Sequence, residues 1–283
     1  MPSQSVRLDS NVRIPVLEPM RRVNAALLEL LRGFDEEDWR RPTIHRDRTV
    51  KDLTAHLLQS SLGRVSALRD GFSPPPPNIR SNEDLVAWIQ SNNREFMAGM
   101  RRTSPQILIE LIATYDQEML AVFERLDPQG EGLGVGWAGE LVSQNWFDVA
   151  REYTEKWHHQ EQLRDATGRP PLYEAELFAP ALETFARGLP HAYRDRAASV
   201  GTQASIGLTG AVELGWTLRR DSDGWSLWSG ITPDAQTSIS LPADVAWRVW
   251  TKGILPEEAM TKMNVQGDKR LAEPLARFVG IMA

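Results

Sequence analysis

The spacing of the apolar residues changes near residue 195, and this change limits the folds open to the chain. Before it, segments such as Leu17–Leu31 place apolar residues three and four positions apart, the spacing of one helix face. After it, Ala204–Leu208 and Val212–Arg219 alternate or are rich in β-branched and aromatic residues, as strands are. The sequence therefore predicts an α+β protein, with a helical part followed by a smaller α+β part.

Start and stop signals divide the first part into separate helices. Thr49, with Asp52 three residues on, is expected to begin a helix, and Ser81 and Ser104 are expected to begin the next two. The proline tract Pro74–Pro77 cannot be helical and is expected to be a loop. The expected helices of this part cover residues 17–31, 50–71, 82–100, 105–126, 143–167 and 174–187.

The second part is expected to combine short strands with two helices. A turn at Asp221–Gly224 joins two of the strands as a hairpin. We place the domain boundary between residues 192 and 193, giving domains 1–192 and 193–283. The other expected elements are strands at 225–228, 237–241 and 263–266, and helices at 243–251 and 269–279.

Composition excludes several functional classes. The net charge of -6 argues against nucleic acid or an anionic membrane as the main partner. No apolar run approaches the ~18–20 residues of a membrane helix, and the polar N-terminus lacks a signal-peptide core, so a cytoplasmic location is expected. With no cysteine, the chain has no disulfide, thiolate ligand or cysteine nucleophile. Any metal must be held by His, Asp or Glu, and any thiol chemistry needs an external thiol.

The segment YTEKWHHQEQLRDAT, residues 153–167, contains two adjacent histidines on an expected helix. Glu155 and His159 are four residues apart, so their side chains lie on one helix face and could share a ligand. His158 points away from that face. Such a pair is common by chance, and a solvent-facing pair without a ligand is the alternative interpretation.

His56 could complete a metal site with this pair. It lies beside a stripe of apolar residues on an expected helix, where a hydrogen-bonded core histidine is the alternative. Two histidines and one carboxylate from two helices would form the open three-ligand site that catalytic divalent metals use. His45, on a charged linker, and His191, after a proline, are expected at the surface. The glycine-rich segment 130–139 is either a simple connector or a mobile loop at the bundle mouth, where Trp137 could line a pocket.

The order of these motifs resembles a known family. DEEDWRRPT (35–43), TVKDLTAHL (49–57) and an E-x-x-x-H helix ending in RDATGRP (164–170) resemble the DinB-like metal-binding four-helix bundles, in particular the mycothiol-dependent maleylpyruvate isomerase branch. The segments 240–254 and 265–279 resemble the sterol-carrier-like α+β second domain of that branch. The resemblance implies that His56, Glu155 and His159 bind the metal.

The resemblance also implies a chemistry. The expected cofactors are a divalent metal, zinc first with nickel as the alternative, and a low-molecular-weight thiol such as mycothiol, which would attack a small electrophilic substrate. Where the family has a catalytic arginine in its second domain this chain has Lys252, and where it often has an aspartate after the second histidine this chain has Gln162. The alternatives are a metal-dependent hydrolase and a non-catalytic protein that binds a small ligand. A monomer or homodimer is expected.

Overall fold

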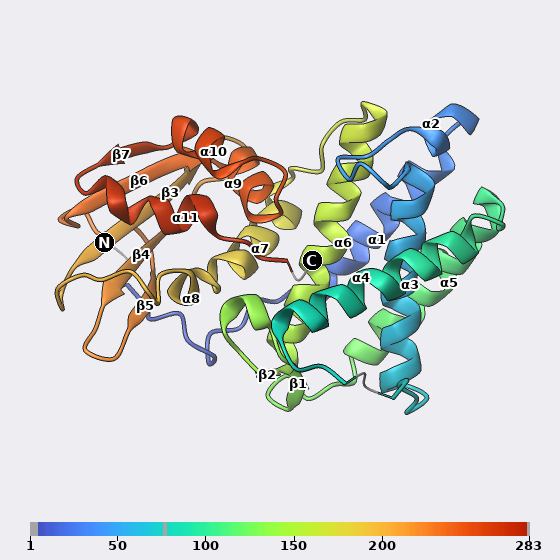
Figure 1. The fold of residues 1–283 in the computed structure, drawn as a ribbon, viewed down its shortest axis with the longest axis horizontal. Helices are drawn as coiled ribbons and strands as arrows, with labels where there is room; N and C mark the ends of the chain where they lie inside the picture. The colour runs from blue at the N-terminus through green and yellow to red at the C-terminus, as the bar shows by residue number, and fades with distance from the viewer. Residues whose placement is uncertain (1–4, 76–77, 282–283) are drawn as a thin grey trace. The chain divides into compact units, whose positions relative to one another are not determined.

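The fold was analysed in a computed structural model that describes residues 5–75 and 78–281 (Figure 1). Contacts divide the chain into two compact units. The helical unit combines Val16–Asp127 with Glu155–Leu172, and the sheet unit combines Met1–Pro15, Pro128–Thr154 and Tyr173–Ile281. The predicted α+β class is confirmed, while the single boundary between residues 192 and 193 stays a prediction.

The helical unit is built around α3 (Val50–Leu68). This helix packs against α4 (Asn82–Met100) and α5 (Pro105–Phe123), and α5 also packs against α1 (Leu17–Arg32). The second half of α6 (Asn145–Thr167) belongs to the same unit. Buried apolar side chains from these helices and from the short α2 (Glu36–Arg40) form one core, which includes Leu27, Leu31, Trp39, Leu53, Leu57, Ile112 and Leu163.

Side-chain caps explain where the long helices begin. The Thr49 hydroxyl accepts from the Asp52 backbone N–H at 3.2 Å, and the Asp52 carboxylate accepts from the Thr49 N–H at 3.0 Å. Ser81 and Asp84 form the same reciprocal cap at α4, while Ser104 caps α5 by accepting from the Ile107 N–H alone, so all three predicted starts are confirmed. Burial alone would raise the pKa of Asp52, but bonds from Arg101 and Thr49 lower it overall, so the capping carboxylate stays ionised.

A five-stranded mixed sheet forms the centre of the sheet unit. Its strand order is β5-β4-β3-β6-β7, with β3 and β6 parallel and the other pairs antiparallel. The strands are β3 (Gln203–Thr209), β4 (Leu214–Arg220), β5 (Trp225–Ser229), β6 (Thr237–Pro242) and β7 (Asn264–Gln266).

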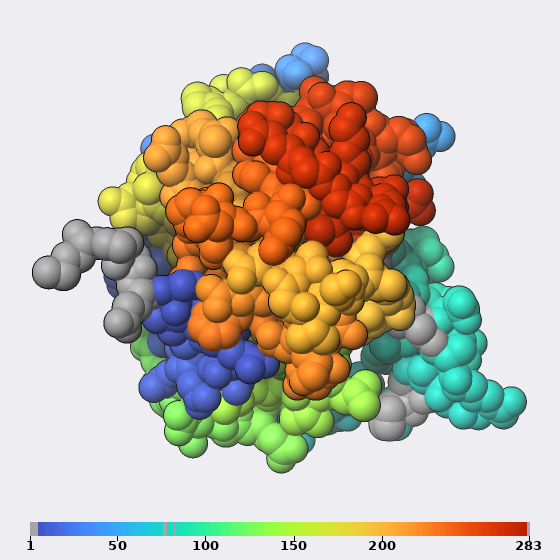
Figure 2. All heavy atoms as spheres, turned by 90° about the vertical axis from the view of Figure 1, so that its left-hand side faces the viewer, coloured from blue at the N-terminus to red at the C-terminus, as the bar shows by residue number. Residues whose placement is uncertain are grey.

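Helices cover this sheet. The helix α9 (Ala243–Trp250) follows β6 and packs on β3 and β6, and α10 (Pro256–Lys262) and α11 (Glu273–Arg277) pack on α9. Figure 2 shows a face of this unit, where the N-terminal segment (blue) lies beside orange residues of the strands and the red final helices lie at the top right of the view. The unit also contains α7 (Ala175–Ala186), α8 (Leu189–Ala192) and a separate hairpin of β1 (Glu131–Leu133) and β2 (Val142–Gln144).

The sequence missed the short elements. It did not predict α2, α8, α10 or the β1–β2 hairpin, whose three to seven residues carry too little periodicity to be recognised. The helix expected over residues 269–279 is wrong, because a 3-10 turn at Lys269–Leu271 precedes the shorter α11. Residues 1–4 of the polar N-terminus and residues 76 and 77 of the proline tract lie outside the described residues. No described helix has the length and apolar character needed to cross a membrane.

A buried lysine joins three helices of the helical unit. Lys156 on α6 donates to the Asp116 carboxylate of α5 at 2.5 Å and to the Ser61 hydroxyl of α3 at 2.7 Å. Its third contact is the Leu57 backbone carbonyl of α3, at 3.2 Å. All three ammonium protons therefore have acceptors, which a buried charge requires.

Removing this ammonium should strongly destabilise the protein. We expect Lys156→Met to lower the free energy of unfolding by about 3–5 kcal/mol, because the Asp116 charge stays buried without its partner. The double variant Lys156→Met/Asp116→Leu should recover most of that loss, and the exposed control Lys269→Met should change little. Urea denaturation of the metal-free proteins measures all three. A loss below about 1 kcal/mol for Lys156→Met would contradict the assignment.

Candidate metal centre

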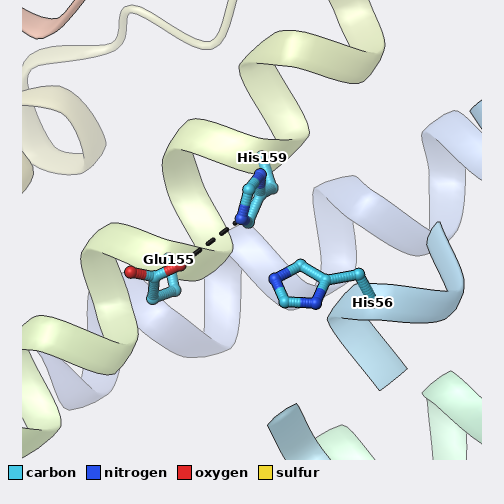
Figure 3. Close-up of side chains that lie close together, drawn as sticks. All are labelled: His56, Glu155 and His159. Atoms are coloured by element: carbon cyan, nitrogen blue, oxygen red, sulfur yellow. Dashed lines mark ion pairs between the residues drawn. The ribbon is translucent and has the colours of Figure 1, made fainter. Parts of the chain in front are cut away.

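Three side chains from two helices converge in the helical unit (Figure 3). His56 lies on α3, and Glu155 and His159 lie on α6. One ligand atom from each lies within 4.8 Å of the other two. His159 Nε2 is 3.3 Å from Glu155 Oε2, and the His56 and His159 rings are nearly perpendicular, with centroids 4.9 Å apart.

Helical spacing explains which of the adjacent histidines takes part. Glu155 and His159 are one turn apart on α6, so both face α3, as the sequence predicts. The His158 ring is close to that of His159, at 4.0 Å between centroids, but His158 does not belong to the cluster. His158 is also buried, so it is a packing neighbour of the cluster.

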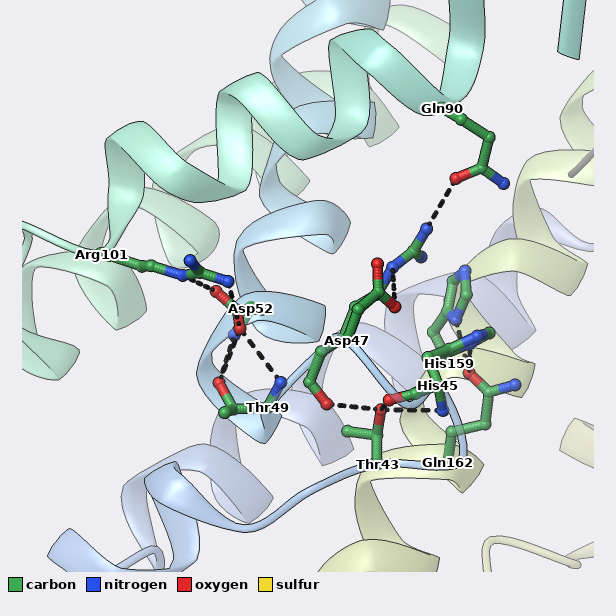
Figure 4. A network of polar contacts seen from close by, with 10 residues as sticks. Thr43, His45, Asp47, Thr49, Asp52, Gln90, Arg101, His159 and Gln162 are labelled. Atoms are coloured by element: carbon green, nitrogen blue, oxygen red, sulfur yellow. Dashed lines mark hydrogen bonds and ion pairs between the residues drawn. The ribbon is translucent and has the colours of Figure 1, made fainter. Parts of the chain in front are cut away.

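Gln162 orients His159 from the adjacent turn of α6 (Figure 4). Its Oε1 lies 2.8 Å from His159 Nδ1 and 3.2 Å from His45 Nε2. An amide oxygen only accepts, so His159 carries its proton on Nδ1 and presents the Nε2 lone pair to the cluster. The amide thus supplies the hydrogen-bond acceptor that a carboxylate would supply in its place.

His45 corrects one expectation from the sequence. It was expected at the surface, and this is wrong: its side chain is half-buried and bonds the Gln162 oxygen that holds His159. Its ring centroid lies 6.2 Å from that of His159. Gln162 and His159 are more than a hundred positions from His45 in the sequence, so no local pattern could reveal this contact.

The histidines of the centre are neutral near pH 7. Burial lowers the pKa of His56 to about 4, although Glu155 opposes the shift. Burial also lowers the pKa of His159 well below its ordinary value, and it lowers the pKa of His45. A neutral imidazole is the form that binds a metal.

The donor set fits a divalent ion. Two neutral imidazoles and one carboxylate are the ligands that zinc and similar ions take in catalytic sites, and they would leave a dication with one net positive charge. His56 Nδ1 is buried and has no hydrogen-bond partner among the described residues, although the ring also bonds the Gln59 side chain, so one ring nitrogen stays available as a donor to an ion. We propose below that His56, Glu155 and His159 act as metal ligands.

Arg48 is a cation near this centre that the sequence did not single out. Its side chain is only 8% exposed, and it donates to the Gln90 oxygen of α4 at 3.0 Å. Its Nε has no hydrogen-bond partner among the described residues, and lies 4.0 Å from the exposed Asp47 carboxylate. After burial, its charge contributes to the lowered pKa of His56 and of His45. The linker between α2 and α3 therefore brings both His45 and a buried positive charge toward the histidines.

Lys252, the predicted catalytic residue, belongs to the sheet unit. It follows the end of α9 with a backbone φ of +62°, and its side chain is exposed. Its catalytic role stays a prediction. His191, also expected at the surface, is half-buried in the same unit.

Comparison with known proteins identifies relatives of the chain. The profile of the mycothiol maleylpyruvate isomerase N-terminal domain matches residues 20–164. Two solved structures share the fold with a TM-score of 0.51: the mycothiol-dependent maleylpyruvate isomerase, at 13% identity, and a histidine-to-alanine mutant of that enzyme, at 12%. Each match covers 82% of this chain and 86% of the other. No curated protein sequence gives a significant match.

The lowered pKa of His56 makes the stability of the metal-free protein depend on pH. Above pH 6.5 the imidazole is neutral in the folded and unfolded states, but between pH 6.5 and about 4 only the unfolded chain binds the proton. We therefore expect the free energy of unfolding to decrease as the pH is lowered from 6.5 to about 4, by up to about 1.4 kcal/mol per pH unit for this group. Denaturation of wild type and His56→Gln at several pH values isolates the contribution of His56. A difference in free energy of unfolding between the two proteins that does not change with pH would contradict this prediction.

The hydrogen bond from His159 to Gln162 should support metal affinity. Gln162→Leu removes the acceptor, and we expect the dissociation constant for zinc to rise about 10–100-fold. Gln162→Glu keeps an acceptor at the same position and should bind zinc at least as tightly as wild type. Competition with a chromophoric chelator measures both constants. Equal affinity of the leucine variant and wild type would show that the bond has no such role.

Proposed function

The chain belongs to the mycothiol maleylpyruvate isomerase family. We propose that it is a metal-dependent enzyme acting on a small electrophilic substrate, which it either isomerises with the help of a low-molecular-weight thiol or joins to that thiol. The observation that carries this proposal is the convergence of His56, Glu155 and His159 within 4.8 Å. Zinc is the first expectation for the metal, with nickel as the alternative. A cytoplasmic location and a monomeric or homodimeric state are also part of the proposal.

The residues of the chain would have separate tasks. His56 and His159 would bind the ion as neutral donors, and Glu155 would add one negative charge. Gln162 would keep the His159 lone pair directed to the ion. Such an ion supplies one effect when bound: its net positive charge lowers the pKa of a thiol that reaches it.

The nucleophile must come from outside the chain. The protein has no cysteine, so a sulfur nucleophile has to be a separate molecule such as mycothiol. In an isomerisation, the sulfur would add to an electrophilic carbon of the substrate, and its later elimination would return the thiol unchanged. Lys252 is our candidate for binding a negative charge on the substrate, as a point charge without the fork of an arginine.

Metal content tests the ligand assignment. We expect the purified wild-type protein to bind about one divalent ion per chain, the number of such clusters found among the described residues. Replacing either His159 or His56 with Ala should abolish this binding. His158→Gln is the matched control, because it changes the adjacent buried histidine and should keep the ion. Elemental analysis measures the number of ions per chain, and circular dichroism checks that each variant is folded. An unchanged metal content in folded His159→Ala would refute the assignment.

The cobalt-substituted protein tests thiol use. We expect mycothiol to add a sulfur-to-cobalt band to the absorption spectrum, since its thiolate would reach the ion. A spectrum unchanged by mycothiol, together with cleavage of an ester or amide substrate, would favour a metal-dependent hydrolase instead. An unchanged spectrum without any turnover would favour a protein that only binds its ligand.

A further inference from the structure

The sheet unit contains a second candidate site, which shares no residue with the metal centre. It is a cavity of about 420 Å³ lined by Trp137, by the chain after α8 and by α11 with the residues that follow it. That volume is within the usual range for small-molecule sites. The sequence suggested that Trp137 could line a pocket at the bundle mouth, which stays a prediction; the cavity that it lines here lies within the sheet unit.

Aromatic rings form the apolar part of the lining. Trp137 and Phe278 pack edge to face with centroids 6.1 Å apart. Gly188 makes this packing possible, since a Cβ there would lie 2.7 Å from both rings. Trp137 is 8% exposed, and its indole Nε1 has no hydrogen-bond partner among the described residues. Phe278 is also buried, so the two rings present only part of their surface to the cavity, and the indole N–H is a buried donor without a partner among the described residues.

Arginines form the charged part of the lining. Arg196 pairs with Glu273 at 2.7 Å, and Arg194 pairs with the exposed Asp195 at 3.4 Å. Arg277 is exposed and has no hydrogen-bond or ion-pair partner among the described residues. The two carboxylates do not balance the three guanidinium groups, so the cavity carries one net positive charge.

The His191 ring lies beside these groups, in space that the missing side chain of Gly139 leaves open. Gly139 has a backbone φ of +84°, and a Cβ at this position would lie 2.4 Å from His191 Nδ1. Both the backbone conformation and the contact with the ring therefore favour glycine. The lining thus contains an imidazole in a defined place, next to the arginines.

We propose that this cavity binds a small aromatic carboxylate. The flat body of the ligand would pack on Trp137 and Phe278, and its carboxylate would bind Arg277, whose planar fork matches two oxygens. A neutral or cationic ligand would fit this lining less well, because it would leave the Arg277 guanidinium without an anionic acceptor. The site would be a second binding function of the chain, separate from thiol chemistry.

Benzoate is the probe for this site. We expect it to bind the EDTA-treated full-length protein and to shift the Trp137 indole N–H signal in ¹⁵N-¹H NMR spectra, assigned with Trp137→Phe. Arg277→Gln should weaken binding about tenfold or more, because one charge-assisted contact is lost. Arg277→Lys should retain part of the affinity, and Arg102→Gln, at another exposed arginine, should bind as wild type does.

Three results would overturn the proposal. The first is equal affinity for benzoate in wild type and Arg277→Gln, since Arg277 is exposed and its loss should not affect folding. The second is equal affinity for benzamide and benzoate, which would exclude recognition of the charge. The third is a saturating titration that leaves the Trp137 signal in place. Removal of metal by EDTA keeps this test independent of the proposed metal centre, where a carboxylate could also bind.

Discussion

The buried ammonium of Lys156 fixes the place where α3, α5 and α6 meet. It is the residue after Glu155, and its acceptor Leu57 is the residue after His56. The same ammonium pairs with Asp116 on α5, so one charge connects three helices. A buried charge tolerates few alternative arrangements, because each lost acceptor costs the desolvation of that group. The spacing of the two helices that carry the histidines therefore depends on this contact.

Burial gives the candidate metal centre its chemical character. It lowers the pKa of His56 and of His159, so both rings are neutral at the pH where they would bind an ion. Gln162 then selects the tautomer of His159. A neutral amide does this without adding charge, so an ion held by these ligands would keep more of its positive charge than it would next to a carboxylate. This distinguishes the chain from the pattern that its family resemblance implies at this position.

Much of the fold could be predicted from the sequence because it depends on local signals. The starts of α3, α4 and α5 follow from Thr49, Ser81 and Ser104, whose side chains bond backbone groups only three residues away. The long helices and the five strands of the sheet follow from the periodicity of apolar residues. The short α2, α8 and α10 were missed because four to seven residues carry too little periodicity to be recognised, although α2 has a local capping box of Asp35 and Asp38 that could have indicated its start.

The sequence by itself determined that Glu155 and His159 share a helix face and that His158 does not, because that follows from the geometry of a single helix. It also determined that any thiol must come from outside, since no cysteine is present. Only the tertiary structure decided that His45 bonds Gln162, that Arg48 is buried near the histidines, and that Lys156 meets Asp116. These contacts join residues distant in the sequence, and their partners are set by how helices pack and not by any local pattern.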